Sequence, residues 1–492
     1  MTAGKVLDLD PLFHPKGVAV LGASQSLTKT GAMILLSIVS GRFRGKVYPI
    51  NPREKEILGV TAYSDLRKVP GDIDLAIICV PAASVSQAVK ECAEVGVKFG
   101  LVISSGFGEV SEEGKAAEKD LIRIASRGGM RLIGPNSMGM VSSDVSLYVL
   151  MNVLLPMAGS VSVVSQSGTL GSLAMVFGSE QSVGFSKFVS SGNEADLHTE
   201  DFIEYLAHDP QTRVILSFVE GVGDGGRFLK VAREATKSKP LVMLKGGISE
   251  AGAKAASSHT GSMAGSPGVY DALFRQAGII QARSDKDLVD LVKAFSLLPP
   301  AKGRKVGIVT GWGGTGVLAS DACAREGLEV PELPDGIMEE LNQFLPPFWS
   351  HRNPVDITGA GIYGDFATLL LKSIEVLLGN ENIDAIICTV PAFGSLFERV
   401  IPRMDPSVAQ NLYKTSLASV IPLERGMAEE IIKLREKYKK PIVGILIGFL
   451  GHKESESIKL LEDNGVPVYE SPFQAAHALS ELALYREYRA VA

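Results

Sequence analysis

Short apolar runs recur along the chain, each bounded by Gly, Pro or Asn and followed by a longer amphipathic segment. Runs of about four to eight residues rich in β-branched side chains are typical of buried strands, and their alternation with helical patterns indicates βαβ units and parallel sheets. The pattern therefore predicts an α/β fold. The predicted strands are Gly17–Ala23, Lys46–Asn51, Asp74–Val80, Gly100–Ser104, Arg131–Ile133, Val161–Ser165, Val214–Val219, Leu241–Leu244, Val306–Thr310, Ala385–Val390 and Ile442–Ile447.

One unit appears three times: an apolar strand that ends in a turn of small residues, from which a helix begins. The copies are GVAVLGASQS from Gly17, SVSVVSQSGTLG from Ser160 and KVGIVTGWGGTG from Lys305, and their starts are 143 and 145 residues apart. Pro-containing stretches of small residues near 155 and 300 are typical of linkers. The spacing predicts three successive doubly wound domains, over residues 1–155, 156–300 and 301–492.

Turns of this kind bind phosphate, because free backbone N–H groups and the positive end of the helix dipole meet the anion. None of the three is a strict G-x-G-x-x-G; the first has only Gly22 and, further on, Gly31. The second predicted strand ends in Asn51–Pro52–Arg53, where an NAD enzyme needs an acidic residue for the ribose. An Arg there favours a phosphorylated ribose, which both NADP and coenzyme A contain.

Composition excludes several classes of protein. The net charge of −6 includes no long basic block, which argues against nucleic-acid binding. No stretch of 18 apolar residues and no apolar signal core occurs, so we expect neither a membrane span nor secretion. The four cysteines are scattered without CxxC or His ligand spacing. We therefore expect reduced thiols, a cytoplasmic protein and no metal site of its own.

Residues 251–265, AGAKAASSHTGSMAG, surround His259 with small side chains. Such a loop has few apolar anchors, and an imidazole nitrogen can accept a phosphoryl group and later release it. The alternative is a Ser/Gly-rich surface loop that contains a histidine by chance. This segment alone does not decide between the two.

Taken in order, VAVLGAS, KVYPINP, DLAIICVP, RLIGPNSMG, VSVVSQSGTLG, VEG and AASSHTGSMAG resemble the α subunit of nucleoside-diphosphate-forming acyl-CoA synthetases, relatives of succinyl-CoA synthetase. The third unit, with HRNPVDITG after it, resembles the CoA-ligase domain that the ADP-forming branch carries on the same chain. The resemblance covers nearly all of residues 10–480 and implies a Rossmann-like CoA-binding domain followed by two flavodoxin-like ligase domains.

The resemblance also implies a reaction. An acid, ATP and CoA give acyl-CoA, ADP and phosphate, reversibly, through an acyl phosphate and a phosphohistidine. His259 matches the phosphorylated histidine. Glu220 matches the carboxylate that orients it; without the resemblance Glu220 is an ordinary acidic residue at a strand end. Phosphate-binding residues implied at two helix N-termini are Ser165, Gln166, Ser167, Gly168 and Thr169, and Gly313, Gly314, Thr315 and Gly316. Their glycines are equally explained by tight turns, and Trp312 departs from the small or polar residue expected there.

By the same resemblance, the first domain binds coenzyme A. The residues implied are Gly22, Ala23 and Ser24 at the pyrophosphate, Pro49, Asn51, Val80 and Pro81 at the adenosine and pantetheine, and Pro135 and Asn136 near the thiol. Lys29 and Arg53 are either phosphate ligands or solvated surface charges. His351, Arg352 and Asp356 are candidates for the acid pocket, with an ordinary turn as the alternative.

The chain has no room for the ATP-grasp fold that holds nucleotide and Mg²⁺ in this family, and it has no G-x-x-x-x-G-K-[ST] loop. The resemblance therefore implies a separate ATP-grasp β subunit, in an assembly of two α and two β chains. That partner supplies the ATP/ADP and Mg²⁺ site, and a small carboxylic acid is the substrate. Two alternatives stay open: a catalytically inactive CoA-binding regulatory module of the same fold, and an NADP-dependent oxidoreductase.

Overall fold

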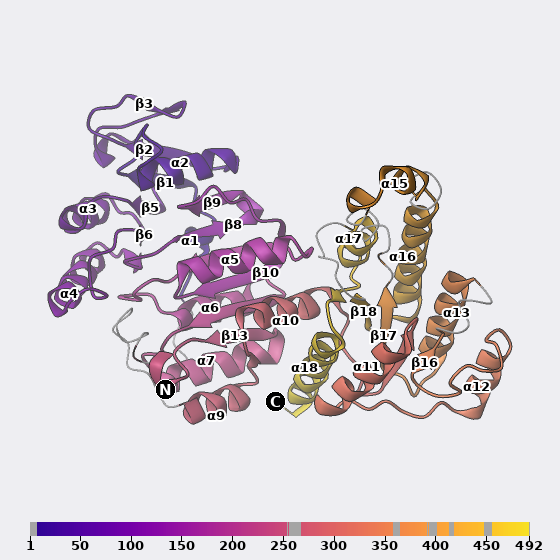
Figure 1. Cartoon of the computed structure of the whole chain (residues 1–492). Coiled ribbons are helices and arrows are strands. Elements are labelled where there is room, and N and C mark those ends of the chain that lie inside the picture. Colours follow the sequence, from indigo (N-terminus) through magenta and orange to yellow (C-terminus); the bar gives the residue numbers. More distant parts are fainter. Residues whose placement is uncertain are drawn as a thin grey trace. The chain divides into compact units, whose positions relative to one another are not determined.

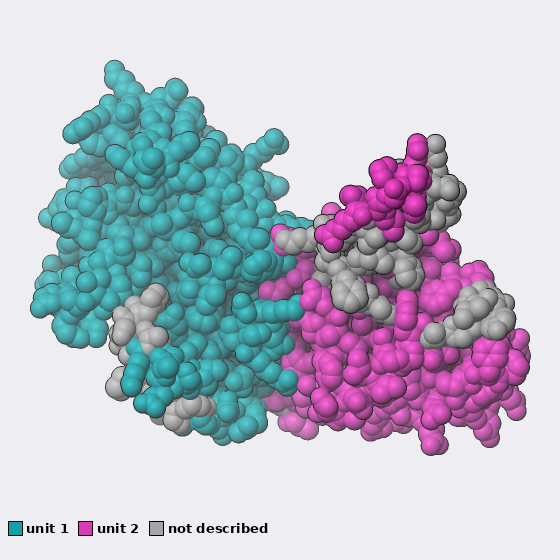
Figure 2. Space-filling view, viewed as in Figure 1, with its two compact units in different colours: residues 1–179, 183–288 teal, residues 180–182, 289–492 magenta. Residues whose placement is uncertain are grey.

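The structure, a computed structural model, describes residues 7–252, 254, 267–357, 365–390, 392, 401–412, 418–446 and 455–491. The chain forms two compact units (Figures 1 and 2). Unit 1 contains residues 1–179 and 183–288, and unit 2 contains residues 180–182 and 289–492. Two of the three large sheets lie in unit 1 and the third lies in unit 2, so each unit is described separately.

The first sheet of unit 1 is parallel, with the strand order β2-β1-β5-β6-β7. Alternate residues of one strand enter different cores: Val18 and Val20 pack with α2, whereas Ala19 and Leu21 pack with α3 and α4. Helices therefore cover both faces, as a doubly wound sheet requires. The elements are β1 Gly17–Leu21, β2 Lys46–Ile50, β5 Leu75–Ile78, β6 Phe99–Val102, β7 Arg131–Ile133, α2 Thr30–Ser40, α3 Ala82–Glu94 and α4 Glu112–Arg127, with the small hairpin β3 Glu56–Ile57 and β4 Val60–Thr61.

The second sheet of unit 1 has the order β14-β13-β12-β10-β11-β8-β9. Its first five strands are parallel, and the β8–β9 hairpin adds to β11 in the antiparallel direction. Helices α6, α7 and α9 supply buried residues to the core on one side, while α5 packs on β10 and β11. The elements are β8 Gly139–Ser142, β9 Leu147–Leu150, β10 Ala158–Ser165, β11 Phe185–Ser190, β12 Val214–Val219, β13 Leu241–Lys245, β14 Ile280–Ala282, α5 Gly168–Ser179, α6 Thr199–His208, α7 Gly225–Ser238 and α9 Pro267–Ala277.

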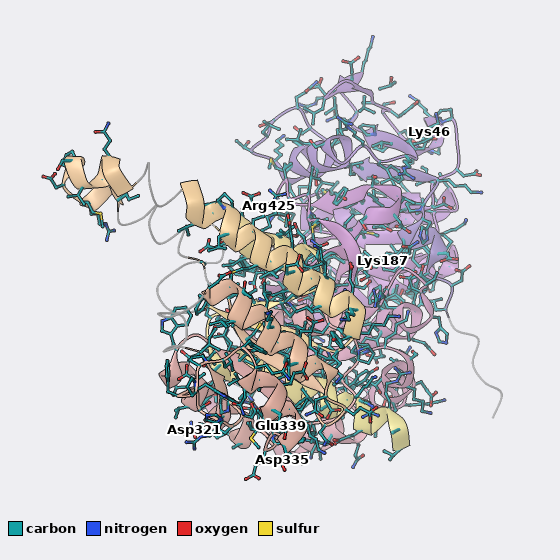
Figure 3. The ribbon with its side chains drawn as sticks, turned by 90° about the vertical axis from the view of Figure 1, so that its right-hand side faces the viewer. Lys46, Lys187, Asp321, Asp335, Glu339 and Arg425 are labelled. Atoms are coloured by element: carbon teal, nitrogen blue, oxygen red, sulfur yellow. The ribbon has the colours of Figure 1, made fainter. Side chains whose placement is uncertain are left out.

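One hydrophobic core runs through both sheets of unit 1. The short helix α1 (Asp10–Phe13) contributes to it, with Phe13 stacked on Tyr205 of α6 at 5.1 Å between ring centroids. Lys187 of β11, labelled in Figure 3, is buried beside this contact and donates a hydrogen bond of 3.0 Å to Asp209. A buried ammonium needs such a partner, because leaving it unpaired is costly.

Unit 2 contains the third sheet, which is parallel with the order β16-β15-β17-β18-β19. Helices α13, α16 and α17 supply buried residues to its main core. Helices α11 and α18 pack against each other; α11 contacts β15, and α18 contacts β17, β18 and β19. The elements are β15 Val306–Thr310, β16 Val355–Asp356, β17 Ala385–Val390, β18 Ile442–Leu446, β19 Val468–Tyr469, α11 Gly313–Arg325, α12 Asp335–Asn342, α13 Phe366–Gly379, α15 Pro406–Leu412, α16 Ala418–Tyr438, α17 Glu456–Asp463 and α18 Pro472–Val491. Helix α10, Asp285–Leu297, begins in unit 1 and continues into unit 2 from Val289.

The α/β prediction with doubly wound sheets is confirmed, and four predicted strands have the predicted bounds: β7, β12, β15 and β17. The others differ by one to three residues at their ends, and Ile447 of the last predicted strand lies outside the described residues. The expectation of parallel sheets was incomplete, because the β8–β9 hairpin and β11 were missed. The connection of the hairpin includes Ser146, whose φ of +58° is a backbone conformation that favours glycine. Because a serine occupies this position, the sequence contains no glycine that would indicate the turn.

Candidate functional site

A cavity of about 630 Å³ lies at the carboxyl ends of the strands of the first sheet. The loops after β1, β2, β5 and β6 line it, which is where parallel α/β sheets bind ligands. Six residues predicted to bind CoA line this cavity: Gly22, Ala23, Ser24, Asn51, Val80 and Pro81.

Close backbone packing builds the wall of this cavity. Gly22 has a φ of +85°, and a Cβ atom there would lie 2.4 Å from the carbonyl oxygen of Cys79. A Cβ on Gly31, in the first turn of α2, would lie 2.2 Å from the carbonyl oxygen of Gly22. Asn51 donates a hydrogen bond of 2.8 Å to the Ala23 carbonyl. The two glycines and Asn51 thus fix the turn against the ends of β2 and β5 and the start of α2.

The helix after this turn begins later than the sequence suggests, at Thr30, so a longer loop borders the cavity. Lining residues that the sequence did not single out are Thr28, Thr30, Gly31, Cys79, Ala82, Ile103, Ser104, Ser105 and Met151; Lys29, an open candidate, also lines it. The pair Ser104–Ser105, at the end of the predicted strand Gly100–Ser104, was the available signal. Pro49 is buried within β2 and pairs with Val20, and it does not line the cavity.

Pro135 and Asn136 line neither this cavity nor a second cavity of unit 1, of about 440 Å³, but they pack against Gly192 and Asn193, which line the second. Gly134–Pro135 is a cis peptide, and the Asn136 side chain donates to Asn193 at 3.3 Å. The Asn136 amide donates to the carbonyl of Ser104, which lines the first cavity, whereas Asn193 lines the second. The predicted thiol-end residues therefore connect the walls of the two cavities.

The second cavity has a polar lining that sequence analysis missed. The Asn193 amide donates to Glu109 at 2.5 Å and to Glu118 at 2.8 Å. Burial raises the pKa of the Glu118 carboxyl. The Glu194 carboxylate, 3.8 Å from Nδ1 of His198, raises the pKa of that histidine. The lining of this cavity therefore combines carboxylates, an imidazole and amides, which suits a polar ligand.

The predicted phosphate turn Ser165–Thr169 begins α5 and borders the same cavity through Gln166. Within the described part of the chain, the amides of Gly168 and Thr169 donate to no residue. A Cβ on Gly168 would lie 2.0 Å from the Cβ of Met138, so only glycine fits. Two free amides at the positive end of a helix of twelve residues are well suited to an anion.

Glu220 follows β12 and is held beside this turn. The side-chain oxygen of Gln166 accepts the amides of Glu220 at 2.6 Å and Gly221 at 3.2 Å, and its nitrogen donates to the Gly221 carbonyl at 2.8 Å. Glu220 is only 9% exposed. The structure therefore brings together two site residues predicted from separate motifs, Gln166 and Glu220.

The remaining predicted phosphate turn is in unit 2, where Gly313, Gly314, Thr315 and Gly316 form the first turn of α11. The amides of Thr315 and Gly316 donate to the Trp312 carbonyl at 3.0 and 3.3 Å. Trp312 packs edge-to-face on Phe366 at 6.0 Å. A Cβ on Gly313 would lie 2.9 Å from a carboxylate oxygen of Asp356, so an acidic group borders this helix start and opposes anion binding there.

His259 lies outside the described residues. In the sequence, the described residues just before it are β13, residues 246–252 and residue 254, and those after it start with α9. No described helix is long and apolar enough to span a membrane.

Comparison with known families matches three domain models in order along the chain. The CoA binding domain matches residues 16–143, the succinyl-CoA ligase like flavodoxin domain matches residues 158–295, and the Ligase-CoA domain matches residues 306–427. The first model covers the residues that line the larger cavity except Met151, and the second covers Gln166, Glu220 and His259.

Two curated relatives are from Pyrococcus furiosus. The α subunit of its acetate–CoA ligase (ADP-forming) II is 39% identical over 475 residues, covering 96% of each chain. The α subunit of isoform I is 38% identical over 493 residues, covering 98% of this chain and 99% of the relative. A solved structure of the dinucleotide-forming acetyl-coenzyme A synthetase 1 of Ca. Korarchaeum cryptofilum, in complex with phosphate and ADP, has a TM-score of 0.86 at 34% identity, covering 98% of each chain. The chain therefore belongs to the family of ADP-forming acyl-CoA ligases within the succinyl-CoA ligase superfamily, and it matches the α subunits along nearly its whole length.

Proposed function

We propose that this chain is the CoA-binding, phosphoryl-carrying α subunit of an ADP-forming acyl-CoA synthetase. The proposal rests mainly on one observation: Gln166, in the turn that begins α5, forms hydrogen bonds with the backbone of Glu220 and Gly221. The same unit contains the larger cavity, at the ends of the first sheet's strands. Relatives named as α subunits of ADP-forming acetate–CoA ligases support the proposal. The reversible reaction converts an acid, ATP and CoA into acyl-CoA, ADP and phosphate.

In the direction of thioester synthesis, a nitrogen of His259 attacks the γ-phosphorus, so that a P–N bond forms and the P–O bond to ADP breaks. The carboxylate of the acid then takes the phosphoryl group from the histidine and becomes an acyl phosphate. The CoA sulfur attacks the acyl carbon and displaces inorganic phosphate, which takes up the thiol proton. Three easier transfers thereby replace one difficult condensation.

Each group of site residues has a role in this proposal. Glu220 accepts the second imidazole N–H of His259 and stabilises the positive charge that phosphorylation creates. Backbone amides in the turns Ser165–Thr169 and Gly313–Gly316 are the proposed ligands of the phosphoryl oxygens. The second turn is the weaker of the two, because the amides of Thr315 and Gly316 already donate to the Trp312 carbonyl and the Asp356 carboxylate borders the helix start. We assign coenzyme A to the larger cavity, where glycine at positions 22 and 31 lets the loop backbone pack closely. Residues 1–155, 156–300 and 301–492 are the three domains.

The nucleotide chemistry requires a second chain. We assign the ATP/ADP and Mg²⁺ site to an ATP-grasp β subunit, in a cytoplasmic assembly of two α and two β chains. The α-subunit names of the relatives support a β partner, and the ATP-grasp fold and the two-plus-two stoichiometry are part of the proposal. The comparisons do not favour a catalytically inactive CoA-binding module.

The test is reconstitution with the ATP-grasp protein made alongside this chain. The two chains, alone and together, are given ATP, Mg²⁺, CoA and a panel of acids that begins with acetate, and ADP, phosphate and acyl-CoA are measured. The proposal predicts equal amounts of the three products for at least one acid, and only when both chains are present. CoA binding without any acyl-CoA across the panel would overturn it.

A further inference from the structure

Lys245, the last residue of β13, is a buried lysine without a role in the chemistry proposed above. It is 3% exposed. Its ammonium donates to the Glu220 carbonyl at 2.8 Å and also to the carbonyl of Gly246. Burial lowers the pKa of this lysine, although the Glu220 carboxylate opposes the shift. A group this costly to bury requires an explanation in structure or in function.

Tyr270 of α9 closes the other side of the ammonium. Its ring centroid lies 4.5 Å from the Lys245 nitrogen, a cation–π contact in a desolvated setting. Tyr270 is 8% exposed, and burial raises the pKa of its hydroxyl, while a hydrogen bond with the backbone of Val222 opposes that shift. Lys245 and Tyr270 thus hold the turn 220–222 at both of its ends.

These contacts complete the fixation of Glu220 that Gln166 begins. Gln166 binds the amides of Glu220 and Gly221 and the carbonyl of Gly221. Lys245 donates a hydrogen bond to the carbonyl of Glu220, the backbone acceptor of that residue. The backbone that carries the carboxylate is therefore held from β10 on one side and from β13 on the other.

The same two residues flank His259 in the sequence. Lys245 ends the last strand before the segment that contains His259, and Tyr270 is in the first helix after it. Both ends of that segment are consequently tied to the Glu220 turn through one ammonium.

We propose that Lys245, with Tyr270 over it, is a positioning residue for phosphoryl transfer: it holds the Glu220 turn in register with the two ends of the segment that carries His259. This inference rests on the proposed function of Glu220 and His259. Misplacing a catalytic group by about 1 Å costs on the order of 100-fold in rate. Loss of the ammonium should therefore slow the transfer without affecting the larger cavity.

The chain offers a control lysine near the other end of the same strand. Lys239, just before β13 begins, donates to the carbonyls of Leu206 at 2.7 Å and Asp209 at 2.5 Å. Burial also lowers its pKa. Lys239→Met thus removes an ammonium that binds two carbonyls at the opposite end of β13, away from Glu220.

The experiment measures single-turnover transfer from labelled ATP to His259 in the full chain assembled with its ATP-grasp partner, and the Kd for CoA. For Lys245→Met we expect a rate at least about tenfold lower with an unchanged Kd. Lys239→Met should change neither by more than about twofold. In a Glu220→Gln background, Lys245→Met should cost less than about threefold, because its effect acts through Glu220.

Two results would overturn the inference while leaving the proposed function intact: transfer by Lys245→Met at the wild-type rate, or the same cost in both backgrounds. No label in the wild type would overturn the proposed function itself. Should Lys245→Met fail to bind CoA through misfolding, Tyr270→Phe decides, because it keeps the ring and removes only the hydroxyl at Val222. Slower transfer with unchanged CoA binding supports the inference, and an unchanged rate refutes it.

Discussion

Replacing Gln166 by Leu tests the link between the phosphate turn and Glu220. The substitution keeps most of the side-chain volume and removes three hydrogen bonds, to the amides of Glu220 and Gly221 and to the Gly221 carbonyl. A buried polar group that loses its partner costs about 1–3 kcal/mol. Since Gln166 is half-buried, water can replace part of this loss, and we take about 2 kcal/mol for the whole turn.

Local opening of the turn should then become roughly 30-fold more frequent, at about 1.4 kcal/mol per factor of ten. Hydrogen exchange of a peptide covering residues 214–224, followed by mass spectrometry, measures this change. Gln166→Glu partly separates structure from charge: its carboxylate still accepts both amides but cannot donate to the Gly221 carbonyl, so exchange should rise less than in Gln166→Leu, while the added negative charge beside Glu220 slows phosphorylation. Gln87→Leu, an exposed position on α3, is the control. Wild-type exchange in Gln166→Leu would refute the assigned role.

Two further predictions concern the cavities. Gly22→Ala should abolish the CoA binding that calorimetry measures, because the added Cβ would clash with the Cys79 carbonyl. Gly59→Ala is the control: its φ is also positive, at +78°, but no atom lies within 4 Å, so the Kd should not change. Equal effects of the two substitutions would contradict the packing argument. His198→Gln should lower the Tm most near pH 6 and progressively less towards pH 8.5. The raised pKa of His198 gives stability that is complete below its unfolded value of about 6.5 and is lost as the pH rises through the folded value. A Tm difference independent of pH would show that protonation of His198 does not contribute.

The doubly wound fold was predictable because strands such as Val214–Val219, apolar except for Ser217, lie between polar and Gly-rich segments. Strands that obey no such pattern were missed. β11, Phe185–Ser190, contains Lys187, whose charge suggests exposure, although Asp209 neutralises it in the core. Tertiary pairing of this kind leaves no signal in the local sequence.

The site was predictable as far as motifs reach. Gln166 and Glu220 lie in different motifs, and only the fold shows that they form hydrogen bonds. Lys245 was not a candidate, because an apolar strand ending in Lys looks like an ordinary strand end at the surface. Asn193 was also missed, because it lies in the second cavity only through the packing of residues 135–136 against residues 192–193, which are distant in the sequence.

The most direct test of the central claim is the identity of the phosphorylated residue. The chain and its ATP-grasp partner are incubated with labelled ATP and Mg²⁺, without acid or CoA, and the label is assayed for acid lability and located by mass spectrometry at alkaline pH. We predict one acid-labile phosphate on His259, none in His259→Ala, and its release as ATP on addition of ADP. Label on another residue, or equal labelling of His259→Ala, would contradict the account.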